Sequence, residues 1–282
     1  MQTPELRQLA LSALCEPDPS RKCEQVAALQ ALAGSPGRLG LQPQARLQPT
    51  AGQPLPGRPP HPTLIAPGRV PQRLPHTLPG RAALLHAICH IEFNAINLAL
   101  DAVWRFAGMP DAFYFDWLRV AAEEARHFTL LRAHLRGLAQ GDDGQPRWDY
   151  GSFEAHDGLW AMCEKTADDS VARMALVPRT LEARGLDATP LIQAKLRQVG
   201  TSDALQAIGL LDLILRDEVG HVAIGNRWYR WLCEQQGLEP IGHYIVLARR
   251  HSAPRLKPPF NDTARRAAGF SQAELDYLQQ VV

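Results

Sequence analysis

The chain has 282 residues, of which 45% are hydrophobic and 21% are charged, and its formal net charge is +1. These values exclude fibrous and disordered classes, and the length allows one large domain or two ordinary ones with a sizeable core. A charge this close to zero gives no overall attraction to nucleic acid or to an anionic membrane.

The N-terminal sequence does not read as a secretory signal. It carries acidic residues and lacks a long apolar core followed by a small-residue cleavage site. The most apolar stretch, residues 82–104, is too polar for a membrane span. It is interrupted by His86, His90, Glu92 and Asp101. We therefore expect a cytoplasmic protein without a membrane segment.

The cysteines suggest neither a disulfide framework nor a zinc clip. Five are present, widely spaced and without a Cys-x-x-Cys pair, so we expect reduced and mostly buried thiols. They are Cys15, Cys23, Cys89, Cys163 and Cys233.

The N-terminal third divides into two parts. Residues 1–34 form a helical segment in which we expect two short helices, the second from a cap at Ser20 to Gly34. Residues 35–79 contain 12 of the 23 prolines, and proline removes the N–H donors that helices need. This window predicts an extended arm.

Four long amphipathic segments follow and predict an all-α four-helix bundle over residues 80–237. The segments are 80–107, 111–139, 157–200 and 203–236. The third contains Pro178 and is expected to be interrupted again from Gly185 to Pro190, so we expect a kink or break near its middle. Residues 238–282 are expected to form a helical extension packed on the bundle.

Two Glu-x-x-His motifs lie on different predicted helices: Glu124 to His127, and Glu218 to His221. Residues three apart share a helix face. With 13 Glu and 10 His in the chain, about half a motif is expected by chance, so two are uncommon.

The other two long segments each offer one carboxylate in an apolar run, Glu92 and Glu182. A carboxylate there must be paired or metal-bound, because burying an isolated ion costs several kcal/mol or more. One Glu from each of two helices plus Glu-x-x-His from each of two others is the ligand arrangement of ferritin-like di-metal proteins.

The spacing of these residues places them at matching heights. Glu92 lies 17 residues before the turn at Met109 and Glu124 lies 15 after it. Likewise, 18 residues separate Gly200 from Glu182 on one side and from Glu218 on the other. At about 1.5 Å per residue both pairs match along an antiparallel bundle. The predicted metal ligands, which are also the predicted catalytic residues, are Glu92, Glu124, His127, Glu182, Glu218 and His221.

A site this rich in oxygen ligands favours iron or manganese over structural zinc. We expect two iron ions, with manganese or a mixed pair as alternatives. Ligating histidines usually donate their second N–H to a carboxylate, so Asp217 and Glu123, each beside a motif Glu, are candidate acceptors. His90 is expected to support the ligands or to pack between helices.

At these residues the sequence resembles the ferritin-like superfamily, and more closely the bacterial family known as domain of unknown function 455. The resemblance runs from about residue 65 to the end. It rests on GRAALLHAICHIEFNAINLALDAVWRF, DWLRVAAEEARHF, HDGLW, RMALVPRTLEARGLDATP, LRDEVGHVAIGNRW and PRLKPPFNDTARRAAGF. It implies the fold and the di-metal site. A more distant likeness to the di-iron hydroxylase of a modified tRNA adenosine suggests an activity by analogy only.

The leading hypothesis is a di-iron oxidoreductase that uses dioxygen to hydroxylate or oxidise an unidentified substrate, with a possible electron-donor protein. The alternatives are a non-catalytic iron-storage or metal-sensing protein and a tRNA-modifying hydroxylase. We expect a monomer or a small homo-oligomer.

Each residue set also has an ordinary interpretation. The six residues are alternatively satisfied polar groups, and Glu182, beside Arg179 and Arg184, is alternatively a surface ion pair. A basic C-terminal set can attract an anionic substrate such as RNA, although a solvated surface is the default. That set is Arg249, Arg250, Arg255, Lys257, Arg265 and Arg266.

Overall fold

The computed structural model describes residues 3–280, and over that range the chain is all-α, as predicted, with no β-strand. The α-helices are α1 (Leu6–Leu14), α2 (Pro19–Ala33), α3 (Leu78–Arg105), α4 (Asp111–Gly137), α5 (Gly158–Lys165), α6 (Ser170–Leu176), α7 (Ala183–Val199), α8 (Ser202–Gln235), α9 (Pro240–Arg250), α10 (Asp262–Ala267) and α11 (Gln272–Gln280). The 3-10 turn η1 is Pro67–Arg69, and the π-helical segment η2 is Val177–Glu182.

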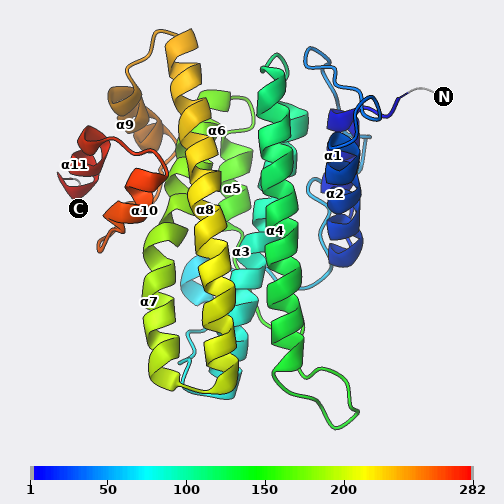
Figure 1. Ribbon diagram of the computed structural model, residues 1–282, viewed down its shortest axis with the longest axis vertical. Helices are drawn as coiled ribbons and strands as arrows, with labels where there is room; N and C mark the ends of the chain where they lie inside the picture. Colours follow the sequence, from blue (N-terminus) through cyan, green and yellow to red (C-terminus); the bar gives the residue numbers. More distant parts are fainter. Residues whose placement is uncertain (1–2, 281–282) are drawn as a thin grey trace. The chain divides into compact units, whose positions relative to one another are not determined.

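The chain forms two compact units, residues 1–160 and 161–282, with the division inside α5. In the first unit, α3 and α4 form an antiparallel pair, α1 packs on α3, and α2 packs on α4 (Figure 1). The tight α3–α4 turn uses Gly108 at φ +80°, whose N–H donates to the Pro43 carbonyl at 2.7 Å. The predicted helices at 80–107 and 111–139 are therefore present within two residues of their expected ends.

The proline-rich arm lies on the first unit and is anchored by a buried arginine. The Arg7 guanidinium donates to the arm carbonyls of Gln42, Pro43 and Ala45 and also to the carbonyl of Trp104 near the end of α3. Such charge-assisted hydrogen bonds are stronger than neutral ones. Apart from η1, the arm from Gly34 to Thr77 contains no helix, and its backbone consists of turns, bends and irregular segments.

A buried lysine anchors the arm a second time. Lys22 of α2 donates to the carbonyls of Leu14 and Gly57 and to Oδ1 of Asn97. Gly57 approaches α1 so closely that a Cβ there would lie 2.1 Å from the Cys15 carbonyl oxygen. Burial lowers the pKa of Lys22 to about 7, because removing water from the ammonium disfavours its charged form.

The second unit is built on the antiparallel pair α7 and α8, joined at Gly200, with α9 and α10 also packed on α8 (Figure 1). Gly200 ends α7 at φ +69°, in the left-handed region that glycine adopts at least cost. A cluster of apolar side chains from α7, α8, α10 and α11 forms a core here. Its buried members are Ala183, Leu186, Val222, Ala268, Phe270, Leu275 and Leu278.

The predicted interruption at Gly185 to Pro190 is wrong. Helix α7 is continuous from Ala183 to Val199 through both residues. A mid-helix proline loses one hydrogen bond and a glycine costs about 1 kcal/mol, and here a buried face repeating every three or four residues offsets both costs. That face is Ala183, Leu186, Thr189, Gln193 and Leu196.

The irregularity lies earlier, in the π-helical segment η2, whose second residue is Pro178. The Thr180 hydroxyl donates to the Ala175 carbonyl, five residues back, which satisfies an acceptor in the widened turn. Gly225 of α8 makes room for this segment, because a Cβ at Gly225 would lie 2.5 Å from Cβ of Pro178.

The sequence predicts that no helix crosses a membrane and that the cysteines are reduced and mostly buried. Within the described residues, α3 alone is long and apolar enough to cross a membrane, but 78% of its most apolar window is buried inside the protein. A core helix passes the same test. All five cysteines are free, and all except the half-buried Cys23 are buried, as expected.

We predict that Lys22 makes stability depend on pH. Its pKa of about 7 in the folded protein lies below its usual 10.5, so the unfolded chain binds more protons between these values and the folded state gains stability as pH rises. From pH 7 to 8.5 this amounts to about 1–2 kcal/mol. Urea unfolding of the parent protein and Lys22→Met at several pH values measures it. The difference between the two proteins should change over this range, and parallel curves would contradict the prediction.

We predict that Gly225→Ala destabilises the second unit by about 1–3 kcal/mol, because the new methyl group meets the Pro178 ring. Gly209, also on α8, is the matched control, since a Cβ there meets nothing within 4 Å. Gly209→Ala should leave stability unchanged or raise it by up to about 1 kcal/mol. Thermal unfolding compares the two variants, and equal midpoints would show that the close approach is not important.

Candidate metal centre

The first unit brings three of the predicted ligands together. Glu92 of α3 and Glu124 and His127 of α4 are all buried, at 3%, 0% and 0% exposure. One ligand atom from each lies within 4.8 Å of the others. His127 Nδ1 is 3.3 Å from Oε2 of Glu124 and 3.4 Å from Oε2 of Glu92. These three side chains form a buried group that can hold a metal ion.

Local structure explains this grouping. Glu124 and His127 are one helical turn apart and share a face of α4. The tight turn after α3 sets the register that places Glu92 opposite them. The helices α3 and α4 also bury the apolar neighbours of these residues in the sequence, such as Phe93 and Ala125.

The charges of this group are strongly coupled. Burial alone would lower the pKa of His127, but hydrogen bonds to Glu124 and Glu92 outweigh it and raise the pKa to about 11. At neutral pH without a metal, His127 is therefore an imidazolium between two carboxylates. Its folded pKa lies above its usual 6.5, so this pairing stabilises the metal-free protein fully below pH 6.5, and the contribution is lost as pH rises through 11.

The second unit carries the other three predicted ligands. His221 of α8 is fully buried, and its Nδ1 is 3.8 Å from Oε2 of the half-buried Glu218 one turn earlier. Glu182 is the last residue of η2 and is 8% exposed. The second motif thus repeats the i, i+3 geometry of the first.

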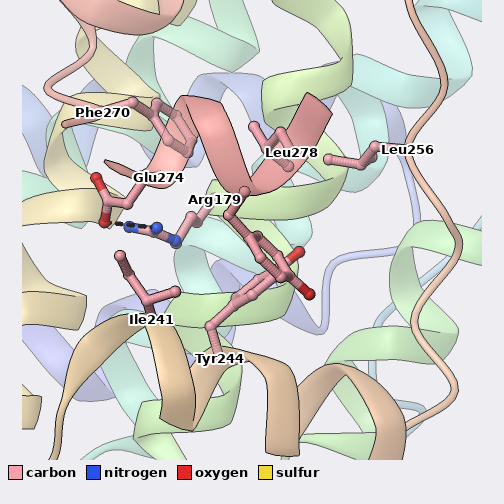
Figure 2. A pocket seen from close by; sticks show the side chains of 8 residues that line it. Arg179, Ile241, Tyr244, Leu256, Phe270, Glu274 and Leu278 are labelled. Carbon is pink, nitrogen blue, oxygen red and sulfur yellow. Dashed lines mark hydrogen bonds and ion pairs between the residues drawn. The ribbon is translucent and has the colours of Figure 1, made fainter. Parts of the chain in front are cut away.

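Arg179 fixes the segment that carries Glu182. Its guanidinium donates to Glu274 Oε1 at 2.6 Å, as Figure 2 shows, and to Asn226 Oδ1 at 3.0 Å. It also lies 5.0–5.6 Å from the ring centroids of Tyr229, Tyr244 and Phe270. The cavity beside it measures about 10 Å³, which is room for about one water molecule, so Arg179 has a structural role. Its strong carboxylate partner is Glu274 of α11.

The residues predicted to support the ligands are Asp217, Glu123 and His90, and the surroundings of each differ from those of the other two. Asp217 forms an ion pair with Arg216 at 3.0 Å, and Glu123 is half-buried on α4. The ring nitrogens of His90 lie 3.0 Å from the Tyr150 hydroxyl and 3.1 Å from the His156 carbonyl. His90 therefore connects α3 to the loop before α5.

Three buried polar residues that matter here were not identified from sequence. Glu274 pairs with Arg179 across 95 residues, and no local pattern reports such a contact. Asn94 and Asn97 of α3 are 2% and 0% exposed. The sequence does indicate that these two residues are unusual, because an asparagine within the apolar run HIEFNAINLAL needs a polar partner.

The three donor groups of the first unit fit a divalent transition metal. Two carboxylates and one imidazole suit iron, manganese or zinc, whereas a structural zinc site would use more sulfur or nitrogen ligands. The carboxylates are already negative, and the imidazole becomes a ligand when it loses its proton.

We predict that binding of Mn²⁺ at pH 7 releases about one proton per occupied site in the first unit, because His127 must lose the proton that Glu92 and Glu124 hold there. Calorimetric titration in two buffers of different ionisation enthalpy counts the proton. Binding heat that does not depend on the buffer would mean that His127 is neutral before the metal arrives.

Comparison with known proteins agrees with the sequence resemblance. The family model "Protein of unknown function (DUF455)" matches residues 15–276. A protein of Haemophilus influenzae (strain ATCC 51907 / DSM 11121 / KW20 / Rd), described as uncharacterized, is 49% identical over 230 residues, covering 79% of this chain and 76% of that protein. No solved structure matches. The match over nearly the whole length shows that this chain belongs to the DUF455 family.

Proposed function

We propose that this protein is a ferritin-like di-metal carboxylate protein that holds two iron ions and uses dioxygen to oxidise or hydroxylate a substrate. The observation that carries the proposal is the buried group of Glu92, Glu124 and His127. His127 carries one positive charge against these two carboxylates in the metal-free protein, so a divalent cation that replaces its proton would compensate their charge more fully. In this proposal, Glu182, Glu218 and His221 of the second unit provide the remaining ligands.

Three features support the second half of the proposed site. The motif Glu218 to His221 repeats Glu124 to His127 in spacing. Glu182 and Glu218 lie equally far from the α7–α8 turn, 18 residues on each side of Gly200. Finally, η2 is a π-helical segment, and such segments often occur at functional sites.

The proposed ligand set is also balanced in charge. Glu92, Glu124, Glu182 and Glu218 supply four negative charges, and His127 and His221 are neutral when they act as ligands. Two divalent cations then make the buried site neutral overall. A single divalent cation would leave two buried negative charges uncompensated, which favours a pair of ions.

A bound iron pair would supply the Lewis-acid and redox chemistry with dioxygen. The six proposed ligands would bind and orient that pair. His127 would give up its Nδ1 proton when a metal is loaded and would offer that nitrogen as a ligand, while Nε2 would keep its own proton. The apolar faces of α3 and α4 keep bulk water away, which strengthens electrostatic interactions inside the site.

We predict a stoichiometry of two Fe²⁺ per chain after anaerobic loading, measured by elemental analysis of desalted protein. Glu92→Gln, Glu124→Gln and Glu218→Gln should each reduce it to one or less, because each removes a negative ligand. Glu154→Gln is the control, since Glu154 is exposed in the loop before α5. The loaded protein should then consume dioxygen faster than free Fe²⁺ does.

The outcomes distinguish the parts of the proposal. Failure to bind iron would remove the metal centre altogether. One ion per chain that is insensitive to Glu218→Gln would restrict the site to the first unit. Two ions that do not react with dioxygen would contradict the oxidase or hydroxylase function while leaving the metal site intact.

A further inference from the structure

The first unit contains a hollow that the proposed metal centre does not use. A cavity of about 330 Å³ lies between the proline-rich arm and α3, and this volume falls in the range of sites that bind small molecules. None of the six predicted metal ligands lines it. The wall residues that keep accessible surface are Arg58, Pro59, Pro60, Thr63 and Leu64 of the arm and Tyr150 of the loop before α5.

The arm segment that forms this wall is fixed at both ends. At one end, Lys22 donates to the Gly57 carbonyl. At the other end, the Ile65 N–H donates to the Ala155 carbonyl at 2.8 Å, and the Ala155 N–H donates to the Thr63 carbonyl at 3.1 Å. A wall that is already in place loses little conformational entropy when it binds a ligand.

Arg58 is the only lysine, arginine, aspartate or glutamate on the described wall of the cavity. Its Nη2 donates to Asp157 Oδ1 at 2.7 Å, and it makes no other hydrogen bond among the described residues. A guanidinium has five N–H donors, so others remain for a ligand. The side chain is 21% exposed and is therefore not enclosed by protein atoms. Arg58 can thus donate hydrogen bonds to a molecule in the cavity.

The ion pair of Arg58 and Asp157 acts on the cavity mainly through its positive member. Burial raises the pKa of Tyr150, whose side chain lines the cavity. Among the charged groups that act on this pKa, Arg58 has the largest effect and opposes the rise, whereas Asp157 acts in the other direction and less strongly. Asp157 is also 31% exposed, so water screens part of its charge. The charge near the cavity therefore favours an anion.

The rest of the accessible wall is mostly apolar. Leu64 is 39% exposed, and Pro59 and Pro60 also keep part of their surface accessible. An apolar group that covers these side chains would be stabilised by the hydrophobic effect in proportion to the area removed from water. A ligand that matches this wall has one anionic end and one apolar body.

We propose that this cavity binds a small monocarboxylate with a compact apolar body. The carboxylate accepts hydrogen bonds from Arg58, and the body lies against Leu64 and the neighbouring prolines. A dianion such as phosphate is less suitable, because one guanidinium that already pairs with Asp157 cannot balance two further negative charges. The proposal does not depend on the metal centre.

Cyclohexanecarboxylate is the probe, and calorimetry on the metal-free full chain should give one bound molecule per chain. Metal-free protein prevents the carboxylate from binding a metal ion instead. Cyclohexanecarboxamide keeps the ring without the charge and should bind at least about 10-fold more weakly, because hydrogen bonds to a charged acceptor are stronger than neutral ones. Acetate keeps the charge without the ring and should also bind at least about 10-fold more weakly, because it covers less apolar surface.

Two variants of the same ion pair separate ligand binding from a structural role. Arg58→Gln should weaken cyclohexanecarboxylate binding by at least about 10-fold, because it removes the positive charge. Asp157→Asn should strengthen binding about 2- to 5-fold, because it removes a nearby negative charge. Arg46→Gln is the control and should leave binding unchanged, since Arg46 is an exposed arginine of the arm that does not line the cavity.

Three outcomes would overturn the proposal. The first is the absence of saturable cyclohexanecarboxylate binding, and the second is equal binding of the carboxylate and the amide. The third is a loss of affinity in both Arg58→Gln and Asp157→Asn, because an ion pair with a purely structural role would weaken binding in both variants. The ligand series uses the parent protein alone, so it decides the question even where a variant fails to fold.

Discussion

The interaction on which the first unit depends is the contact of two buried carboxylates with one buried imidazole. Glu92 and Glu124 flank His127 at 3.4 and 3.3 Å, and all three are shielded from water. Removing His127 would take the positive charge from between two buried carboxylates, which costs several kcal/mol. The register of α3 against α4 is therefore fixed by charge as well as by apolar packing. The same group can hold a metal ion once His127 loses its proton.

The long helices were predictable because their signals are local. Apolar repeats and glycines at turns determine α3, α4 and α8 to within a few residues. The proximity of Glu92 to Glu124 followed from counting along an antiparallel pair. The continuity of α7 was not predictable in this way, because the packing that offsets Pro190 involves other helices. The role of Arg179 was also hidden, since Glu274 follows it by 95 residues.

The arm shows the same limit more strongly. Its prolines predict an extended backbone but not its path, which depends on carbonyl oxygens that every residue has. Arg7 and Lys22 select particular carbonyls, among them those of Pro43 and Gly57. A sequence shows which residues carry charged side chains, but it does not show which backbone oxygen accepts their hydrogen bonds. The cavity between arm and α3 was equally beyond prediction, because it exists only once the arm has been placed.

The anchoring of the arm has a consequence for the order in which the first unit assembles. Arg7 precedes its partner Trp104 by 97 residues, and Lys22 precedes its partner Asn97 by 75. The side chains of Arg7 and Lys22 therefore stay hydrated until most of α3 has been synthesised. Contacts between residues so distant in sequence slow folding, because a long loop must close before they form. We therefore expect the local α3–α4 hairpin to form before α1, α2 and the arm pack on it.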